Sequence, residues 1–272
     1  MKELRLKLSL VSMHDHKFKK EKIGICNICN KKKQLTWDHV PPKGGTGTVS
    51  IVQETVLQKL AAGNEKRYSL SQNGIKYRTI CKECNDKLGL EYDQELNKFV
   101  LGVKDIIEKI RSPLKFISYK VKPNLIIKSI FGHLLAAKVA SENTKIDKSL
   151  KAYFSGESEK AESKLHVYYW LYPFENYVVL RDVVMPKVRG SLENFGMFSI
   201  LKYFPIGYIV TDFEGYENLR ELKYIKGDDN REEKIIIDLK FTHPDWPEII
   251  DNGNILSGGK SVDSSVSAIK KK

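Results

Sequence analysis

The chain has 272 residues, 41% of them hydrophobic, which is enough for one or two folded domains with an ordinary core. No apolar run approaches the roughly 20 residues that span a bilayer, and the N-terminus lacks the continuous apolar segment of a signal peptide. The composition therefore excludes a membrane-spanning protein and predicts a cytoplasmic one, in which reduced thiols are available to bind metal.

The formal net charge is +12, and it is unevenly distributed along the chain. Basic side chains outnumber acidic ones in residues 1–164, whereas acidic side chains are in excess in residues 165–251. A positive field of this kind is the expected footprint of a protein that binds a phosphate backbone. Lysine-rich surfaces also arise for solubility alone, so the charge favours a nucleic-acid partner without establishing one.

All four cysteines fall into two Cys-x-x-Cys pairs, Cys26 with Cys29 and Cys81 with Cys84, which follow a predicted strand over residues 4–10. Each pair has the spacing at which one knuckle presents two thiolates to a tetrahedral metal. Because no cysteine is left over, the pattern predicts a structural Zn²⁺ site rather than disulfides. The alternative is four unrelated buried thiols.

An Asp38-His39 pair lies between the two knuckles, at the end of a predicted strand that residues 41–42, both proline, cannot continue. Neighbouring residues of a strand point to opposite sides, so Asp38 can hold a metal while His39 faces a water as general base. Asn85, at the start of a helix opened by the second knuckle, adds an oxygen ligand of the kind that Mg²⁺ prefers. The alternative is that Asp38-His39 only caps the zinc knuckle and that Asn85 only caps a helix.

The segment between the Asp-His pair and the second knuckle is long enough to hold an inserted element. Ser50 and Gln53 form a capping-box pattern, and apolar residues at helical spacing follow until Gly63-Asn64. We therefore predict an inserted helix at about residues 50–63. Basic side chains around this insert and the motif are expected to contact phosphates: Lys43, Arg67, Arg78, Lys82 and Lys87.

The order Cys-x-x-Cys, Asp-His-Val-Pro-Pro-Lys, Cys-x-x-Cys-Asn over residues 23–99 resembles the HNH endonucleases, the ββα-metal nucleases, in their zinc-knuckle form. The resemblance implies a first strand ending at residues 37–38, a second strand over residues 76–80 and a helix from Cys81. It implies that His39 is the general base and that Asp38 and Asn85 hold a catalytic Mg²⁺ or Mn²⁺. The four cysteines would then clamp the hairpin to the helix.

The chain departs from the family pattern in two places. The asparagine that orients the catalytic histidine is either displaced to Asn73 or missing. A third metal ligand is not evident directly after Asn85; Asp86, Glu91 and Asp93 are candidates, although a carboxylate on a helix face is usually just solvated.

Apolar residues at helical spacing predict one helix from Leu96 to Ile110 and a second from Pro123 to Val139. His133 lies in the second helix and is expected to be a packed histidine rather than a ligand. The polar stretch 141–164 indicates a boundary or a surface excursion. Beyond it, segments rich in Tyr, Val, Ile and Phe predict an antiparallel sheet, with strands over 165–172, 177–185, 195–204, 208–213 and 234–241.

The expected organisation is α+β, with four parts: an HNH domain over residues 1–111, a helical connector over 112–148, a β-rich accessory domain over 149–251 and a flexible basic tail over 252–272. The predicted function is metal-dependent hydrolysis of DNA, single- or double-stranded, in a context that the resemblance links to restriction or antiviral defence. The alternative is a zinc-stabilised nucleic-acid-binding module without cleavage. In either case the accessory domain is expected to bind a protein partner or a ligand, and a homodimer is compatible with cutting both strands.

Overall fold

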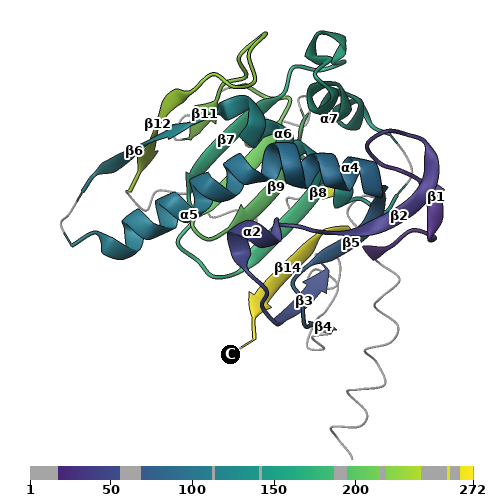
Figure 1. The fold of residues 1–272 in the computed structure, drawn as a ribbon, viewed down its shortest axis with the longest axis horizontal. Helices are drawn as coiled ribbons and strands as arrows, with labels where there is room; N and C mark the ends of the chain where they lie inside the picture. The colour runs from purple at the N-terminus through teal and green to yellow at the C-terminus, as the bar shows by residue number, and fades with distance from the viewer. Residues whose placement is uncertain are drawn as a thin grey trace, which may run out of the picture.

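The computed structural model describes residues 18–55, 69–111, 114–140, 143–186, 195–214, 219–239, 256–257 and 264–271 (Figure 1). These residues form a mixed α/β structure in which every strand pairing is antiparallel. The helices are α2 (Lys43–Thr46), α4 (Lys82–Lys87), the π-helical turn η3 (Leu88–Tyr92), α5 (Asp93–Lys109), α6 (Pro123–Ala136), α7 (Lys145–Ser155) and the single 3-10 turn η4 (Ser158–Lys160).

The strands form three sheets. A small sheet has the order β1-β2-β5, with β1 (Ile23–Ile25), β2 (Lys32–His39) and β5 (Lys76–Cys81). A two-stranded sheet pairs β6 (Phe116–Val121) with β12 (Glu233–Asp238). The large sheet has the order β11-β7-β10-β9-β8-β14-β3-β4, and β13 (Leu256–Ser257) pairs with β8 beside this path. Its other strands are β3 (Ile51–Thr55), β4 (Ser69–Ser71), β7 (His166–Leu171), β8 (Tyr177–Pro186), β9 (Phe195–Tyr203), β10 (Ile206–Thr211), β11 (Arg220–Leu222) and β14 (Val266–Lys270).

The hairpin of β2 and β5 and the helix α4 that follows it have the element order predicted from the sequence. In the pairing, Asp38 lies opposite Tyr77 and His39 lies opposite Lys76. Strand β2 ends at His39, before the two prolines, which cannot donate ladder hydrogen bonds. Cys81 is the extended residue that caps α4, so the second knuckle forms where strand turns into helix.

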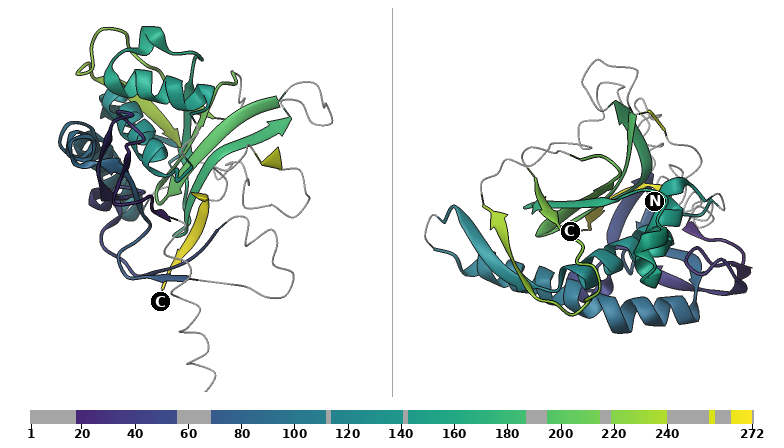
Figure 2. Two further views of the ribbon diagram at one scale, coloured as in Figure 1. Left: turned by 90° about the vertical axis from the view of Figure 1, so that its right-hand side faces the viewer. Right: turned by 90° about the horizontal axis from the view of Figure 1, so that it is seen from above.

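Helices α5 and α6 also match their predicted ranges. One face of α5 buries Leu96, Phe99, Val100 and Val103, as its helical spacing predicts. Almost every side chain of α6 is buried, which is the pattern of a helix enclosed by other elements on all sides. Figure 2 shows the helices on one side of the large sheet, and α6 packs against α5, α7, β2, β5 and β9. No helix in the described part of the chain is both long and apolar enough to cross a membrane.

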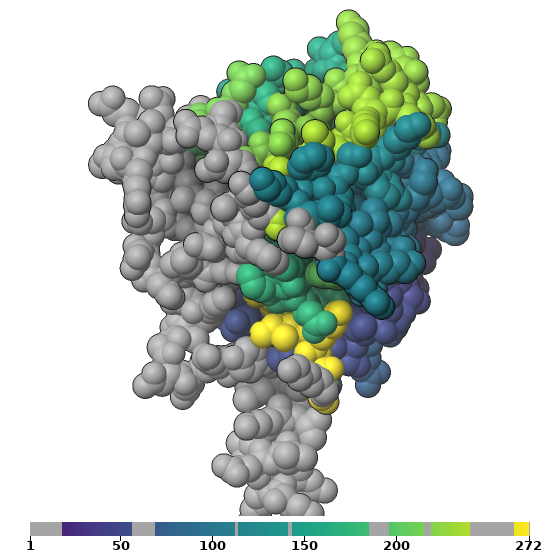
Figure 3. Space-filling view, turned by 90° about the vertical axis from the view of Figure 1, so that its left-hand side faces the viewer, coloured from purple at the N-terminus to yellow at the C-terminus, as the bar shows by residue number. Residues whose placement is uncertain are grey.

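Two predictions about the insert and the tail are wrong. Residues 51–55 of the predicted helix at 50–63 form strand β3, in which Ile51, Gln53 and Thr55 are buried and their neighbours are half-buried. The tail predicted to be flexible supplies strand β14, which lies between β3 and β8 and buries Val266. Figure 3 shows the C-terminal residues beside residues near 50. Pairing partners more than 200 positions apart override the local capping pattern. The predicted strand over 4–10 and residues 56–63 lie outside the described residues.

The predicted boundaries inside the chain also need correction. The limit at 148/149 falls inside α7, a helix that begins with a Thr144–Asp147 capping box and buries the apolar residues Ile146, Leu150 and Phe154. The expected helical connector over 112–148 contains strand β6, which pairs with β12. Strands from the predicted N-terminal domain and from the tail share the large sheet with the predicted accessory domain.

Candidate functional site

The four cysteines lie together and form a cluster that fits a metal ion such as zinc. Their Sγ atoms all lie within 4.8 Å of one another, and those of Cys29 and Cys81 are 3.9 Å apart. A tetrahedral site with Zn–S bonds of about 2.3 Å has S–S edges of about 3.8 Å. The thiol positions therefore match the zinc geometry that the spacing of the cysteines predicts.

Local hydrogen bonds shape the two knuckles. In the first, the main-chain amide of Cys26 donates to the carbonyl of Lys31 at 3.0 Å, and Asn30 closes the turn with a positive φ of 57°. Asparagine tolerates that left-handed conformation better than most residues. In the second, the amide of Cys81 donates to Sγ of Cys26 at 3.3 Å. This bond joins the two knuckles directly and stabilises negative charge on the sulfur.

The thiols differ in their affinity for a proton. A hydrogen bond from Cys84, opposed by burial and assisted by main-chain amides, lowers the pKa of Cys26 to about 4. Burial is the main cause that raises the pKa of Cys81 to about 12, and a hydrogen bond with Cys26, followed by burial, raises the pKa of Cys84. The lowered pKa favours the thiolate of Cys26, which is the form that binds a metal.

Asp38 points from the end of β2 into the interior. It is 7% exposed, and its Oδ2 accepts a hydrogen bond from Nδ1 of His133 at 3.0 Å. The other ring nitrogen of His133, Nε2, donates to Oδ1 of Asp93 at 2.9 Å, and Ser129 donates to the same oxygen at 2.6 Å. Strand β2 and helices α5 and α6 thus meet in a buried Asp–His–Asp chain.

His133 carries a positive charge at neutral pH in this position. Burial alone disfavours the charged imidazole, but the carboxylates of Asp93 and Asp38 overcome that effect and raise its pKa to about 10. His133 is fully buried, as the sequence predicts for a packed histidine, but it is also the partner of the candidate metal ligand Asp38. Nothing in the local pattern signals this, because 95 residues separate the two. Asp93, a candidate third ligand, binds His133 instead.

His39 lies on the opposite side of β2 from Asp38, as strand alternation predicts, and is half-buried. Burial lowers its pKa; Asp38 opposes that change, and the charges of Lys76 and Lys43 reinforce it. A hydrogen bond with the main chain of Asn73 also acts on the imidazole. His39 is therefore neutral at physiological pH and able to accept a proton. The orienting role of Asn73 stays a prediction.

Asn85 fastens helix α4 to strand β2. Its Nδ2 donates to the carbonyl oxygen of Trp37 and to Oγ1 of Thr36, both at 3.1 Å. The atoms that remain to bind a cation are therefore the amide oxygen of Asn85 and Oδ1 of Asp38. Both are hard oxygen donors that suit Mg²⁺ or Mn²⁺. No hydrogen bond joins these two side chains within the described residues.

The predicted phosphate-contacting residues differ in their surroundings. Lys43 is exposed at the start of α2. Lys82 forms an ion pair with Asp86, and the Nζ of Lys87 lies 5.7 Å from the ring centroid of Tyr92 and from that of Phe154. Arg78 donates to the carbonyl of Lys20 at 3.0 Å. Arg67 lies outside the described residues.

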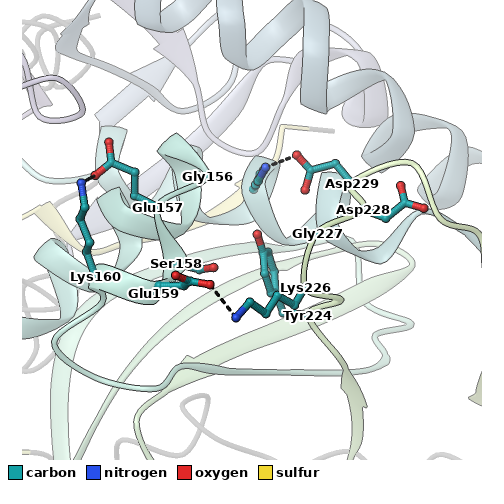
Figure 4. Close-up of a pocket in the computed structure, with 11 residues that line it drawn as sticks. Gly156, Glu157, Ser158, Glu159, Lys160, Tyr224, Lys226, Gly227, Asp228 and Asp229 are labelled. Carbon is teal, nitrogen blue, oxygen red and sulfur yellow. Dashed lines mark hydrogen bonds and ion pairs between the residues drawn. The ribbon is translucent and has the colours of Figure 1, made fainter.

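A separate groove of about 510 Å³ lies between the end of α7, η4 and the segment 224–229 (Figure 4). Its charged side chains pair with one another: Lys226 with Glu159, Lys160 with Glu157, and the buried Lys128 with Asp229. A second hollow of about 370 Å³, which shares Tyr224, contains a pair of His166 and Glu221 at 2.7 Å. Because these charges are satisfied internally, neither groove resembles a reaction centre.

No model of a known protein family, no curated protein and no solved structure matches this chain.

Proposed function

We propose that this protein is a metal-dependent endonuclease of the HNH type that hydrolyses phosphodiester bonds of DNA. The observation that carries the proposal is the position of His39: a half-buried imidazole at the end of a hairpin that a four-cysteine cluster joins to a helix. Asp38 and Asn85, from the same strand and that helix, supply the oxygen donors.

In this proposal His39 removes a proton from a water, which attacks phosphorus in line. A neutral imidazole has one ring nitrogen that carries no proton, and that nitrogen accepts the proton of the water. Asp38 and Asn85 would hold a divalent cation, which would stabilise the charge that develops on the phosphate and on the leaving 3′ oxygen. The zinc cluster acts as structure and takes no part in the reaction.

Cleavage in a titration of Mg²⁺ or Mn²⁺ tests the cation-binding part of the proposal. Asp38→Asn and Asn85→Ala are expected to raise the cation concentration needed for half-maximal cleavage, while the zinc content stays unchanged. The resemblance to HNH enzymes also implies products with a 5′-phosphate and a 3′-hydroxyl. Cleavage by the zinc-loaded protein that is equally fast without added Mg²⁺ or Mn²⁺ contradicts the proposal.

The second candidate is a zinc-stabilised DNA-binding module without turnover. The contacts of Asp38 and Asn85 favour it, because one carboxylate oxygen is occupied by His133 and the amide nitrogen of Asn85 is bound to the backbone of β2. Both candidates place the protein in the cytoplasm, in restriction or antiviral defence by analogy, and give the C-terminal sheet the task of binding a partner or a ligand.

A further inference from the structure

The solvent-facing side of the β2–β5 hairpin carries an aromatic ring beside the candidate catalytic histidine. Trp37 is 42% exposed, and it shares one face of β2 with His39, two residues further along. Asp38, between them, points the other way into the core. At about 3.4 Å per residue, Trp37 and His39 lie about 7 Å apart along the strand.

Two cations from strand β5 lie over this ring. In the antiparallel register Arg78 is opposite Trp37 and Lys76 is opposite His39. The guanidinium carbon of Arg78 is 5.4 Å from the ring centroid, and the Nζ of Lys76 is 5.9 Å from it. Among the described residues neither cation forms an ion pair with a carboxylate, although Nη2 of Arg78 donates to the carbonyl of Lys20 at 3.0 Å.

This combination differs from an ordinary exposed apolar residue. A single exposed tryptophan needs no explanation in a soluble protein. Here the ring, two cations that form no ion pair within the described residues and the side chain of His39 occupy one strip of two adjacent strands. Proteins that bind single-stranded nucleic acids combine these parts: an aromatic face on which a base stacks and basic side chains along the backbone.

We propose that Trp37, Lys76 and Arg78 form a stacking platform that binds an unpaired base of the nucleotide next to the phosphodiester at His39. The substrate class is therefore single-stranded or locally unpaired DNA, because the bases of an intact duplex have no free face to offer the ring. This inference rests on the proposed function, which it deepens by naming the substrate class.

The binding test uses zinc-loaded protein without added Mg²⁺ or Mn²⁺, so that it does not depend on cleavage. Anisotropy measures the affinity of the full chain for a labelled oligothymidylate, a duplex of equal length and an abasic strand of equal length. Trp37→Leu is expected to weaken binding of the oligothymidylate by roughly fivefold to 150-fold, the range of one lost base stack. Trp37→Phe should retain most of the affinity, and binding of the duplex and the abasic strand should change less than twofold.

Phe116→Leu is the matched control, because Phe116 is an exposed aromatic residue on strand β6, at the far end of the molecule from β2 (Figure 1). It should leave all three affinities unchanged. Equal losses on the oligothymidylate and the abasic strand, or no loss on either, overturn the platform. If the platform result holds but the zinc-loaded protein cuts no DNA with Mg²⁺ or Mn²⁺, the proposed nuclease activity fails and the binding site stands.

Discussion

Replacing His133 removes the cation that joins two buried carboxylates. In His133→Leu both hydrogen bonds, 3.0 Å to Asp38 and 2.9 Å to Asp93, are lost. The side chains of Asp38 and Asp93 are 8% and 14% exposed, so water replaces little of the lost interaction. Removing one partner of a buried pair costs about 3–5 kcal/mol. Ser129 still donates to Asp93, which places the expected loss near 4 kcal/mol, on the order of 8–16 °C in Tm for a chain of this size.

Thermal and urea unfolding of the zinc-loaded protein measure this loss. His166→Leu is the control, because His166 is also buried but its partner Glu221 is 29% exposed and can be solvated. It should cost about 1–2 kcal/mol less than His133→Leu. Adding Asp93→Asn to His133→Leu should restore part of the stability, since it removes one uncompensated charge. A loss below about 1 kcal/mol in His133→Leu refutes the reasoning.

Three further outcomes follow from the metal cluster, the buried ion pairs and the net charge. Cys81→Ser should lose bound zinc and much of the stability of the hairpin, because structural zinc contributes folding energy; full zinc content and an unchanged Tm contradict this. Although burial opposes it, the charges of Arg181 and Lys138 lower the pKa of Asp147, so its stabilisation is complete above about pH 4 and is lost as the pH falls. Acid unfolding should therefore be shallower in Asp147→Asn than in the wild type, and parallel curves speak against it. DNA affinity should fall steeply with salt, and a flat dependence excludes a phosphate-binding surface.

The elements around the motif could be predicted because their signals are local. Two prolines end β2 and the second knuckle opens α4. Segments rich in Tyr, Val, Ile and Phe mark most strands of the large sheet, and a 3.6-residue period marks helices α5 and α6. The clustering of the cysteines likewise follows from their spacing. The identity of the HNH core and its activity remain predictions.

What could not be predicted depends on contacts between distant residues. Strand β3 carries a helix-capping pattern, and it is a strand because it pairs with β4 and with β14, the second of which lies more than 200 positions away. His133 is one polar residue in a buried helix, and its partners Asp38 and Asp93 come from other elements. Helix α7 was not predicted, because it lies in a polar stretch and its apolar residues occupy only one face of the helix.

Cleavage of supercoiled plasmid and single-stranded DNA by zinc-loaded protein with Mg²⁺ or Mn²⁺ tests the nuclease proposal most directly. The wild type is compared with His39→Ala, and His166→Ala serves as a control for loss of a histidine elsewhere. Metal-dependent cutting should persist in the control and fall by about 10²–10⁴-fold in His39→Ala, the contribution of one general base. Equal cutting by His39→Ala, or no cutting by a wild-type protein that binds DNA and zinc, contradicts the proposal.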